Sequence, residues 1–98
     1  MADATAHIGV LSLELRLPDV QSLKGKRRVL KSLKDRIRGD FNVSVSEIGH
    51  LDAWQKAAFG ICAIGNDKPY LDQNLQRILS WIDTVGEIQI LDHEIHFF

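Results

Sequence analysis

The chain has 98 residues, 45% of them hydrophobic, with a formal net charge of −1 and a pI near 6.4. This length suits one domain with a modest core, and the charge excludes a histone-like polycation without excluding a local nucleic-acid patch. A single cysteine, Cys62, excludes a disulfide framework and a structural zinc site, and its apolar surroundings predict a buried thiol.

Residues 1–6 are predicted to be a flexible N-terminal tail, and residues 7–98 a single domain. The tail has no basic or apolar region of a secretory signal, and no run is long enough to span a membrane. We therefore expect a cytoplasmic protein without a membrane partner. From His7 to Leu17 leucines alternate with polar side chains, which predicts a strand with one face buried and one face in solvent.

Residues 22–39, SLKGKRRVLKSLKDRIRG, predict a helix that concentrates the positive charge of the chain. Ser22 is a typical N-cap, and Gly39 stands where a glycine often ends a helix. The segment holds eight of the twelve Lys and Arg residues and one acid, so it carries +7 while the rest carries −8. The eight cations are Lys24, Lys26, Arg27, Arg28, Lys31, Lys34, Arg36 and Arg38.

The helical periodicity separates an apolar stripe from a row of cations that runs from Lys24 to Arg38, about 21 Å at 1.5 Å per residue. Lys26 projects into the apolar arc, so its ammonium must reach solvent or meet an acceptor. Cations crowd the helix start, where the dipole is already positive, and Gly25 allows close approach to the backbone. This combination predicts an anion site, although a solvated basic face is an equally open interpretation.

The remaining elements follow from alternation and turn residues. Phe41 to Ile48 and Trp54 to Gly65 predict two strands, the second apolar on both faces and therefore central in its sheet. A second helix is predicted from the Asn66-Asp67 cap to Gly86, followed by a last strand over 87–98 with a bulge between Ile90 and Leu91.

The order strand, helix, strand, strand, helix, strand predicts an α+β fold of the ferredoxin-like βαββαβ type. Its four-stranded antiparallel sheet should carry both helices on one face. The opposite face is left for solvent or for a partner, and Gly60, Cys62 and Ile64 on that face would suit a homodimer contact.

Several segments together resemble the YlxP-like family, small bacterial proteins catalogued as a domain of unknown function. They are SLKGKRRVLKSLKDRIR at 22–38, FNVSVSEIG at 41–49, Asp52-x-Trp54-Gln55, and Asn66-Asp67. The family more often has an acid where this chain has Gly25, so the helix start here is more cationic. The resemblance implies a ferredoxin-like fold in the bacterial cytoplasm and, through its usual gene neighbours, a link to translation. It implies no reaction and no catalytic residue.

No catalytic constellation emerges from the spacing. His93 and His96 are three apart on a predicted strand and should face opposite ways, so we expect no metal site there. The stretch with His50, Asp52, Trp54 and Gln55 offers an orienting carboxylate, an amide and a stacking surface. The alternative is that Trp54 anchors a strand end while Asp52 caps the turn.

Two functions remain open, and we expect no cofactor for either. One is a non-enzymatic RNA-binding or ribosome-associated module without aromatic base readout on the sheet, because the outward positions there are Ser12, Glu14, Ser44 and Ser46. The other is a homodimeric small-anion-binding or regulatory module with its pocket at the first helix start. In the RNA-binding module, phosphates are expected at Lys24, Lys26, Arg27, Arg28, Lys31, Lys34 and Arg38, with His50, Asp52, Trp54 and Gln55 as accessory residues.

Overall fold

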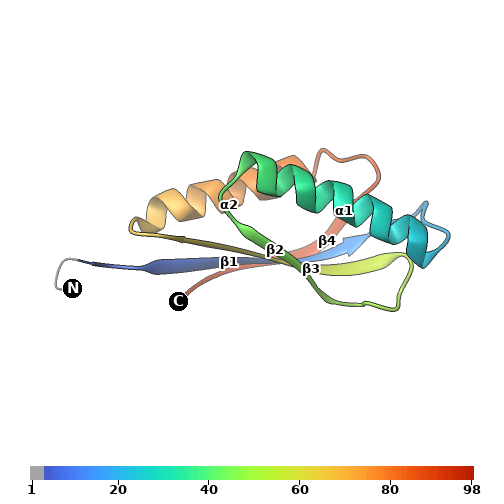
Figure 1. Ribbon diagram of the computed structural model, residues 1–98, viewed down its shortest axis with the longest axis horizontal. Helices are drawn as coiled ribbons and strands as arrows, with labels where there is room; N and C mark the ends of the chain where they lie inside the picture. The colour runs from blue at the N-terminus through green and yellow to red at the C-terminus, as the bar shows by residue number, and fades with distance from the viewer. Residues whose placement is uncertain (1–3) are drawn as a thin grey trace.

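The computed structural model describes residues 4–98 and has the ferredoxin-like arrangement of six elements (Figure 1). The predicted tail therefore lies partly outside the described residues, since residues 1–3 are not among them. The elements are β1 (His7–Arg16), α1 (Leu23–Asp40), β2 (Ser44–Gly49), β3 (Lys56–Gly65), α2 (Lys68–Ile82) and β4 (Gln89–Phe97).

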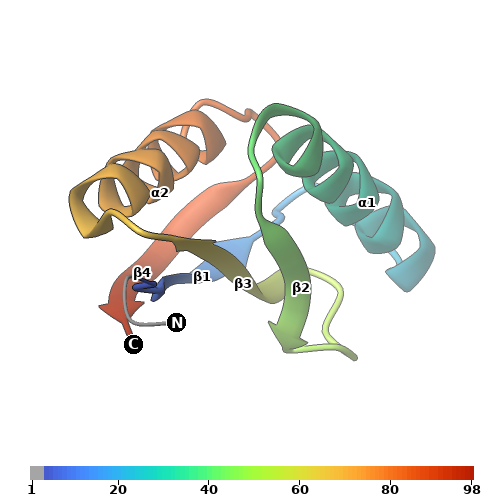
Figure 2. The same cartoon turned by 60° about the vertical axis from the view of Figure 1, so that its left-hand side comes forward.

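The four strands form one antiparallel sheet in the order β2-β3-β1-β4, so the apolar β3 lies inside the sheet as predicted. Both helices cover the same face, and the opposite face carries no helix (Figure 2). Ser12 on β1 lies opposite Gly60 on β3, which in turn lies opposite Ser46 on β2. This register places the predicted outward residues together on the open face.

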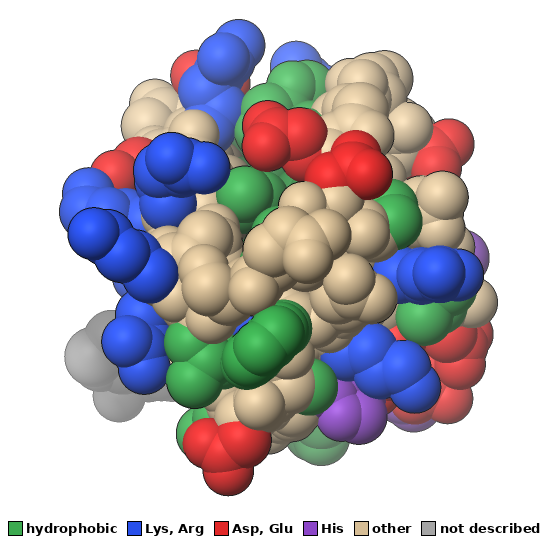
Figure 3. Space-filling view, turned by 90° about the vertical axis from the view of Figure 1, so that its right-hand side faces the viewer, with side chains coloured by type: hydrophobic (Ala, Val, Ile, Leu, Met, Phe, Trp, Pro, Cys, Tyr) green, Lys and Arg blue, Asp and Glu red, His purple; other side chains and the backbone are tan. Residues whose placement is uncertain are grey.

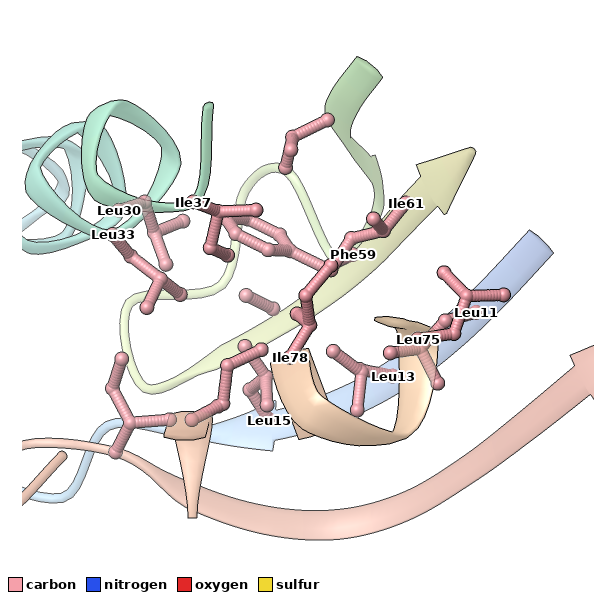
Figure 4. Close-up of a cluster of buried hydrophobic side chains, with 14 of the residues drawn as sticks. Leu11, Leu13, Leu15, Leu30, Leu33, Ile37, Phe59, Ile61, Leu75 and Ile78 are labelled. Carbon is pink, nitrogen blue, oxygen red and sulfur yellow. The ribbon is translucent and has the colours of Figure 1, made fainter. Parts of the chain in front are cut away.

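The core lies between the sheet and the two helices (Figure 4). Alternate leucines of β1 point toward the helices and are at most 2% exposed, because a strand presents every second side chain to one face. Each helix supplies a stripe at helical spacing. The helix residues of this core are Leu30, Leu33 and Ile37 from α1, and Leu71, Leu75, Ile78 and Ile82 from α2.

Helix boundaries confirm one expectation and correct two. Ser22 caps α1, and its side chain accepts a hydrogen bond from the Gly25 N–H at 3.0 Å. Gly39 does not end this helix: it lies in the last turn, and Phe41 provides an extended C-cap without any left-handed glycine. The second helix stops at Ile82, before Gly86, because the chain continues in short turns.

Strand irregularities lie next to the edges of the sheet. The pairing of β1 with β4 shifts between Glu14 and Leu15, which leaves Leu91 as the extra residue and confirms the predicted bulge. A second shift, which periodicity did not predict, separates Glu47 from Gly49 on β2. Cys62 is half-buried on the open face, which corrects the expectation of a fully buried thiol.

Candidate nucleic-acid interface

Helix α1 leaves most of the cations predicted to bind phosphate exposed to solvent. Five of the seven cations predicted to bind phosphate are exposed, and Lys34 is half-buried. Figure 3 shows a group of Lys and Arg side chains at its left edge, next to exposed hydrophobic side chains, and further Lys and Arg side chains on its right. The exposed five are Lys24, Arg27, Arg28, Lys31 and Arg38.

Few of these charges are neutralised locally. Lys31 pairs with Asp35 at 2.7 Å, and Arg36 pairs with Asp40 at 3.3 Å, each one helical turn apart. The hydrogen bond from Lys31 holds the pKa of Asp35 below its usual value, with further help from the positive charges around it. Lys26 lies beside Glu47, and within the described part of the chain no carboxylate lies within 4 Å of the other five cations, which are Lys24, Arg27, Arg28, Lys34 and Arg38.

Arg38 links the end of α1 to the sheet. Its Nη2 donates a hydrogen bond to the Val45 carbonyl at 2.9 Å, so the guanidinium is held at a fixed position while the residue remains exposed. A guanidinium has five N–H donors, and one bond leaves others free for a phosphate. The cation row therefore extends along the whole helix.

Lys26 is the exception among the predicted phosphate contacts. The residue is 1% exposed, and its ammonium donates to the His50 carbonyl at 2.7 Å. The same ammonium lies 2.8 Å from Glu47 Oε2, a buried oxygen that accepts no well-aligned hydrogen bond from any described residue. Of the two outcomes expected for Lys26, its ammonium meets acceptors and does not reach solvent, so it is out of reach of a phosphate on the surface.

The start of α1 is a shallow hollow of about 520 Å³, lined by Ser22, Lys24, Gly25, Arg27, Arg28 and Lys31. One of its backbone donors is already used, because the Gly25 N–H is bonded to Ser22. A Cβ at position 25 would lie 3.3 Å from the Ser22 hydroxyl, so the glycine permits close packing of this cap. Anion binding here would rest on side-chain cations more than on the backbone.

Hydrogen bonds hold the connection from His50 to Gln55 in place, and its residues differ in what they contact. His50 Nε2 lies 2.8 Å from Glu14 Oε2, so the carboxylate beside this imidazole is Glu14 and not Asp52. The turn itself is closed by a hydrogen bond from the Ala53 N–H to the His50 carbonyl. His50 adopts a left-handed φ of 57°.

Gln55 and Trp54 differ completely in their surroundings. The Gln55 amide donates to the carbonyls of Pro18 and Val20, which ties this connection to the segment before α1. Trp54 precedes β3 and is 53% exposed, so it does not anchor a strand end. Among the accessory residues, Trp54 and Asp52 are therefore the exposed ones that remain available for contact with a ligand.

A wider groove separates α1 from α2, about 760 Å³ and open to solvent. Arg36 lies over the Trp81 ring at 5.5 Å from its centroid, beside Arg28 and Val85. Neither Arg36 nor Trp81 was predicted to be part of a binding surface. Each belongs to a different helix, and no spacing within one helix indicates that they meet.

The histidines of β4 do not assemble a metal centre. His96 lies 3.1 Å from Glu94, and across residues 4–98 no three His, Cys, Asp or Glu side chains gather closely enough to hold a metal ion. Among the described helices, none combines the length and apolar character that crossing a bilayer would require.

Residues 8–95 match the family described as "Protein of unknown function (DUF503)". The chain belongs to the DUF503 family. One relative, the "Uncharacterized protein YlxP" of Bacillus subtilis (strain 168), is 44% identical over 82 residues, which cover 84% of this chain and 89% of the relative. The YlxP-like resemblance is thereby confirmed for most of this DUF503 chain.

One solved structure is similar to this DUF503 domain in its fold. The "De novo designed protein Foldit4" aligns with a TM-score of 0.54 at 18% identity, covering 93% of this chain and 96% of the designed one. At 18% identity this similarity supports a shared fold and says nothing about function. The function must therefore be argued from the surface of α1.

Proposed function

We propose that this DUF503 protein is a non-enzymatic RNA-binding or ribosome-associated module whose phosphate contacts are made by α1. The observation that carries the proposal is the unneutralised charge: Lys24, Arg27, Arg28 and Lys34 have no acid within 4 Å among the described residues. Lysine and arginine rows of this kind bind phosphates and release counterions from nucleic acid.

The arrangement of the charge also supports RNA over a general solubility role. The row is about 21 Å long at 1.5 Å per residue, so it can follow several successive phosphates of one strand. Arg38 extends it to the helix end, where its bond to Val45 fixes the guanidinium. The set proposed to contact phosphate is Lys24, Arg27, Arg28, Lys31, Lys34 and Arg38.

The test compares two variants of equal charge. One replaces Lys24, Arg27, Arg28 and Lys34 of α1 by glutamine, and the other replaces by glutamine the four cations outside α1, which are Arg16, Lys56, Lys68 and Arg77. Binding to fluorescein-labelled ribosomal RNA fragments and to ribosomal subunits is measured by anisotropy and co-sedimentation from about 50 to 200 mM salt.

The α1 variant is expected to lose about 3 units from the magnitude of the log–log salt slope, since each single-strand contact contributes roughly 0.7. The matched variant should keep the wild-type slope, because none of its four cations belongs to α1. Equal losses in both variants would mean that only net charge matters, and absence of binding by the wild type would refute the proposal.

A homodimeric small-anion module is the second candidate, favoured by the hollow at the start of α1 and by the uncovered sheet face, which exposes Ile48 and Ile64. It requires the first turn of α1 but not Lys34 or Arg38. A phosphorylated or carboxylated metabolite should then raise the melting temperature by mass action, and sedimentation should give a dimer. A screen without any shift, on a monomer, would exclude it.

A further inference from the structure

We infer that the nucleic acid recognised by this protein is single-stranded, and that Trp54 stacks on one of its unpaired bases next to the start of α1. This inference rests on the proposed function, which assigns the phosphates to α1. To that function the inference adds that the nucleic acid is single-stranded and that Trp54 contacts one of its bases. Stacking on an exposed aromatic ring is the usual way in which proteins hold unpaired bases without reading their sequence.

Trp54 is exposed on a connection that is held in place from both sides. The neighbouring Gln55 donates to the carbonyls of Pro18 and Val20 at 3.3 and 3.0 Å and accepts, through its own carbonyl, from the Leu17 N–H at 2.9 Å. On the other side, the His50 carbonyl receives the buried Lys26 ammonium. A ring presented by fixed backbone loses little conformational entropy when a base stacks on it.

These same contacts bring Trp54 to the start of the cation row. Lys26 belongs to the first turns of α1, and Val20 lies just before the helix, so the connection packs against this end. Figure 3 shows exposed hydrophobic side chains at this end beside the Lys and Arg side chains. Asp52 is exposed on the same connection and would repel phosphates, which favours a strand path on the α1 side of Trp54.

Other aromatic rings are less suitable. Arg36 already lies over the Trp81 ring, and Arg77 lies over Phe41. Tyr70 is 60% exposed but belongs to the start of α2, which lies at the opposite end of the molecule from the start of α1 (Figure 1). Phe98 is 77% exposed, but it is the C-terminal residue, pairs with Ile8 and also lies away from the start of α1 (Figure 1).

The open sheet face also disfavours RNA. Glu14, Asp92 and Glu94 occupy paired positions on β1 and β4 there, and carboxylates repel the phosphate backbone. The sheet face on which an RRM would stack bases is therefore acidic where these strands meet. Base contact is left to Trp54, and a continuous duplex would keep its bases stacked away from this ring.

The experiment uses fluorescein-labelled oligouridylate of about 12 nucleotides and a duplex RNA of similar length, with the full chain throughout. Trp54→Ala is compared with Tyr70→Ala, a control of similar exposure on the opposite end, and with Trp54→Phe. We expect Trp54→Ala to weaken single-strand binding by about 5- to 100-fold with an unchanged salt slope, and to leave duplex binding unaltered. Tyr70→Ala should bind like the wild type, and Trp54→Phe should retain most of the affinity.

A second readout uses Trp81→Phe, which leaves Trp54 as the one fluorescent indole. Its emission should fall when oligouridylate binds. Normal single-strand binding by Trp54→Ala, or unchanged emission during binding, would overturn the inference while the α1 proposal stands. Tighter binding to duplex would also overturn it, and absence of any RNA binding by the wild type would overturn both.

Discussion

Replacement of Lys26 by methionine tests the buried ion pair that joins α1 to the sheet. Methionine keeps the length and apolar packing of the stem but removes the ammonium, which is 2.7 Å from the His50 carbonyl and 2.8 Å from Glu47 Oε2. The His50 carbonyl then keeps its bond from the Ala53 N–H but loses the ammonium, and the Glu47 carboxylate loses its counter-charge. The side chain is 2% exposed, so water cannot take the place of the ammonium without a local opening.

The expected cost follows from these two losses. Loss of one hydrogen bond costs about 0.5–1.5 kcal/mol, and removal of one partner of a buried ion pair costs about 3–5 kcal/mol. The Glu47 side chain is 22% exposed and can recover some hydration, so the cost lies near the lower end. We expect Lys26→Met to reduce the free energy of unfolding by about 3 kcal/mol.

Urea denaturation followed by circular dichroism measures this loss. The matched control is Lys24→Met, on the same helix but exposed, for which a change within about 0.5 kcal/mol is expected. The double variant Lys26→Met, Glu47→Met should recover most of the loss, because replacing both partners of a buried pair by apolar groups is often neutral.

A cost below about 1 kcal/mol for Lys26→Met would refute the reasoning, since it would mean that the ammonium is solvated in the folded protein. Equal costs for the single and double variants would show that lost packing, and not an orphaned carboxylate, explains the effect.

Three further outcomes are expected. Gly39→Ala should raise the free energy of unfolding by about 0.5 kcal/mol, because an added Cβ in this last helical turn meets nothing within 4 Å. Gly9→Ala should lower it by about 1–3 kcal/mol in the same urea experiment, because the new Cβ would lie 2.9 Å from Leu75 Cδ1. NMR titration should give the Asp35 carboxyl a pKa below its ordinary value, and Lys31→Met should raise that pKa. Because the pKa is lower in the folded protein than in the unfolded chain, the small contribution of this pair to stability is present at neutral pH. It is lost as the pH falls through the folded-state pKa.

Local patterns were sufficient for most of the fold. Alternation and helical spacing place all six elements in their observed order, and the position of β3 inside the sheet follows from its two apolar faces. Boundaries were less accurate at Gly39 and Gly86, because a glycine ends a helix only when the chain there turns into a left-handed conformation. The positive charge of α1 could also be predicted, because it follows directly from the residues that occupy positions 22–39.

The sequence by itself therefore determined the ferredoxin-like order of elements and the cation row of α1. Only the tertiary structure decided that Lys26 meets acceptors instead of reaching solvent, and which aromatic ring stays exposed. Lys26 meets His50, Gln55 meets Val20, and His50 meets Glu14 across 24, 35 and 36 residues of sequence. Contacts at such separations depend on how the layers pack, and no periodicity along one element contains that information.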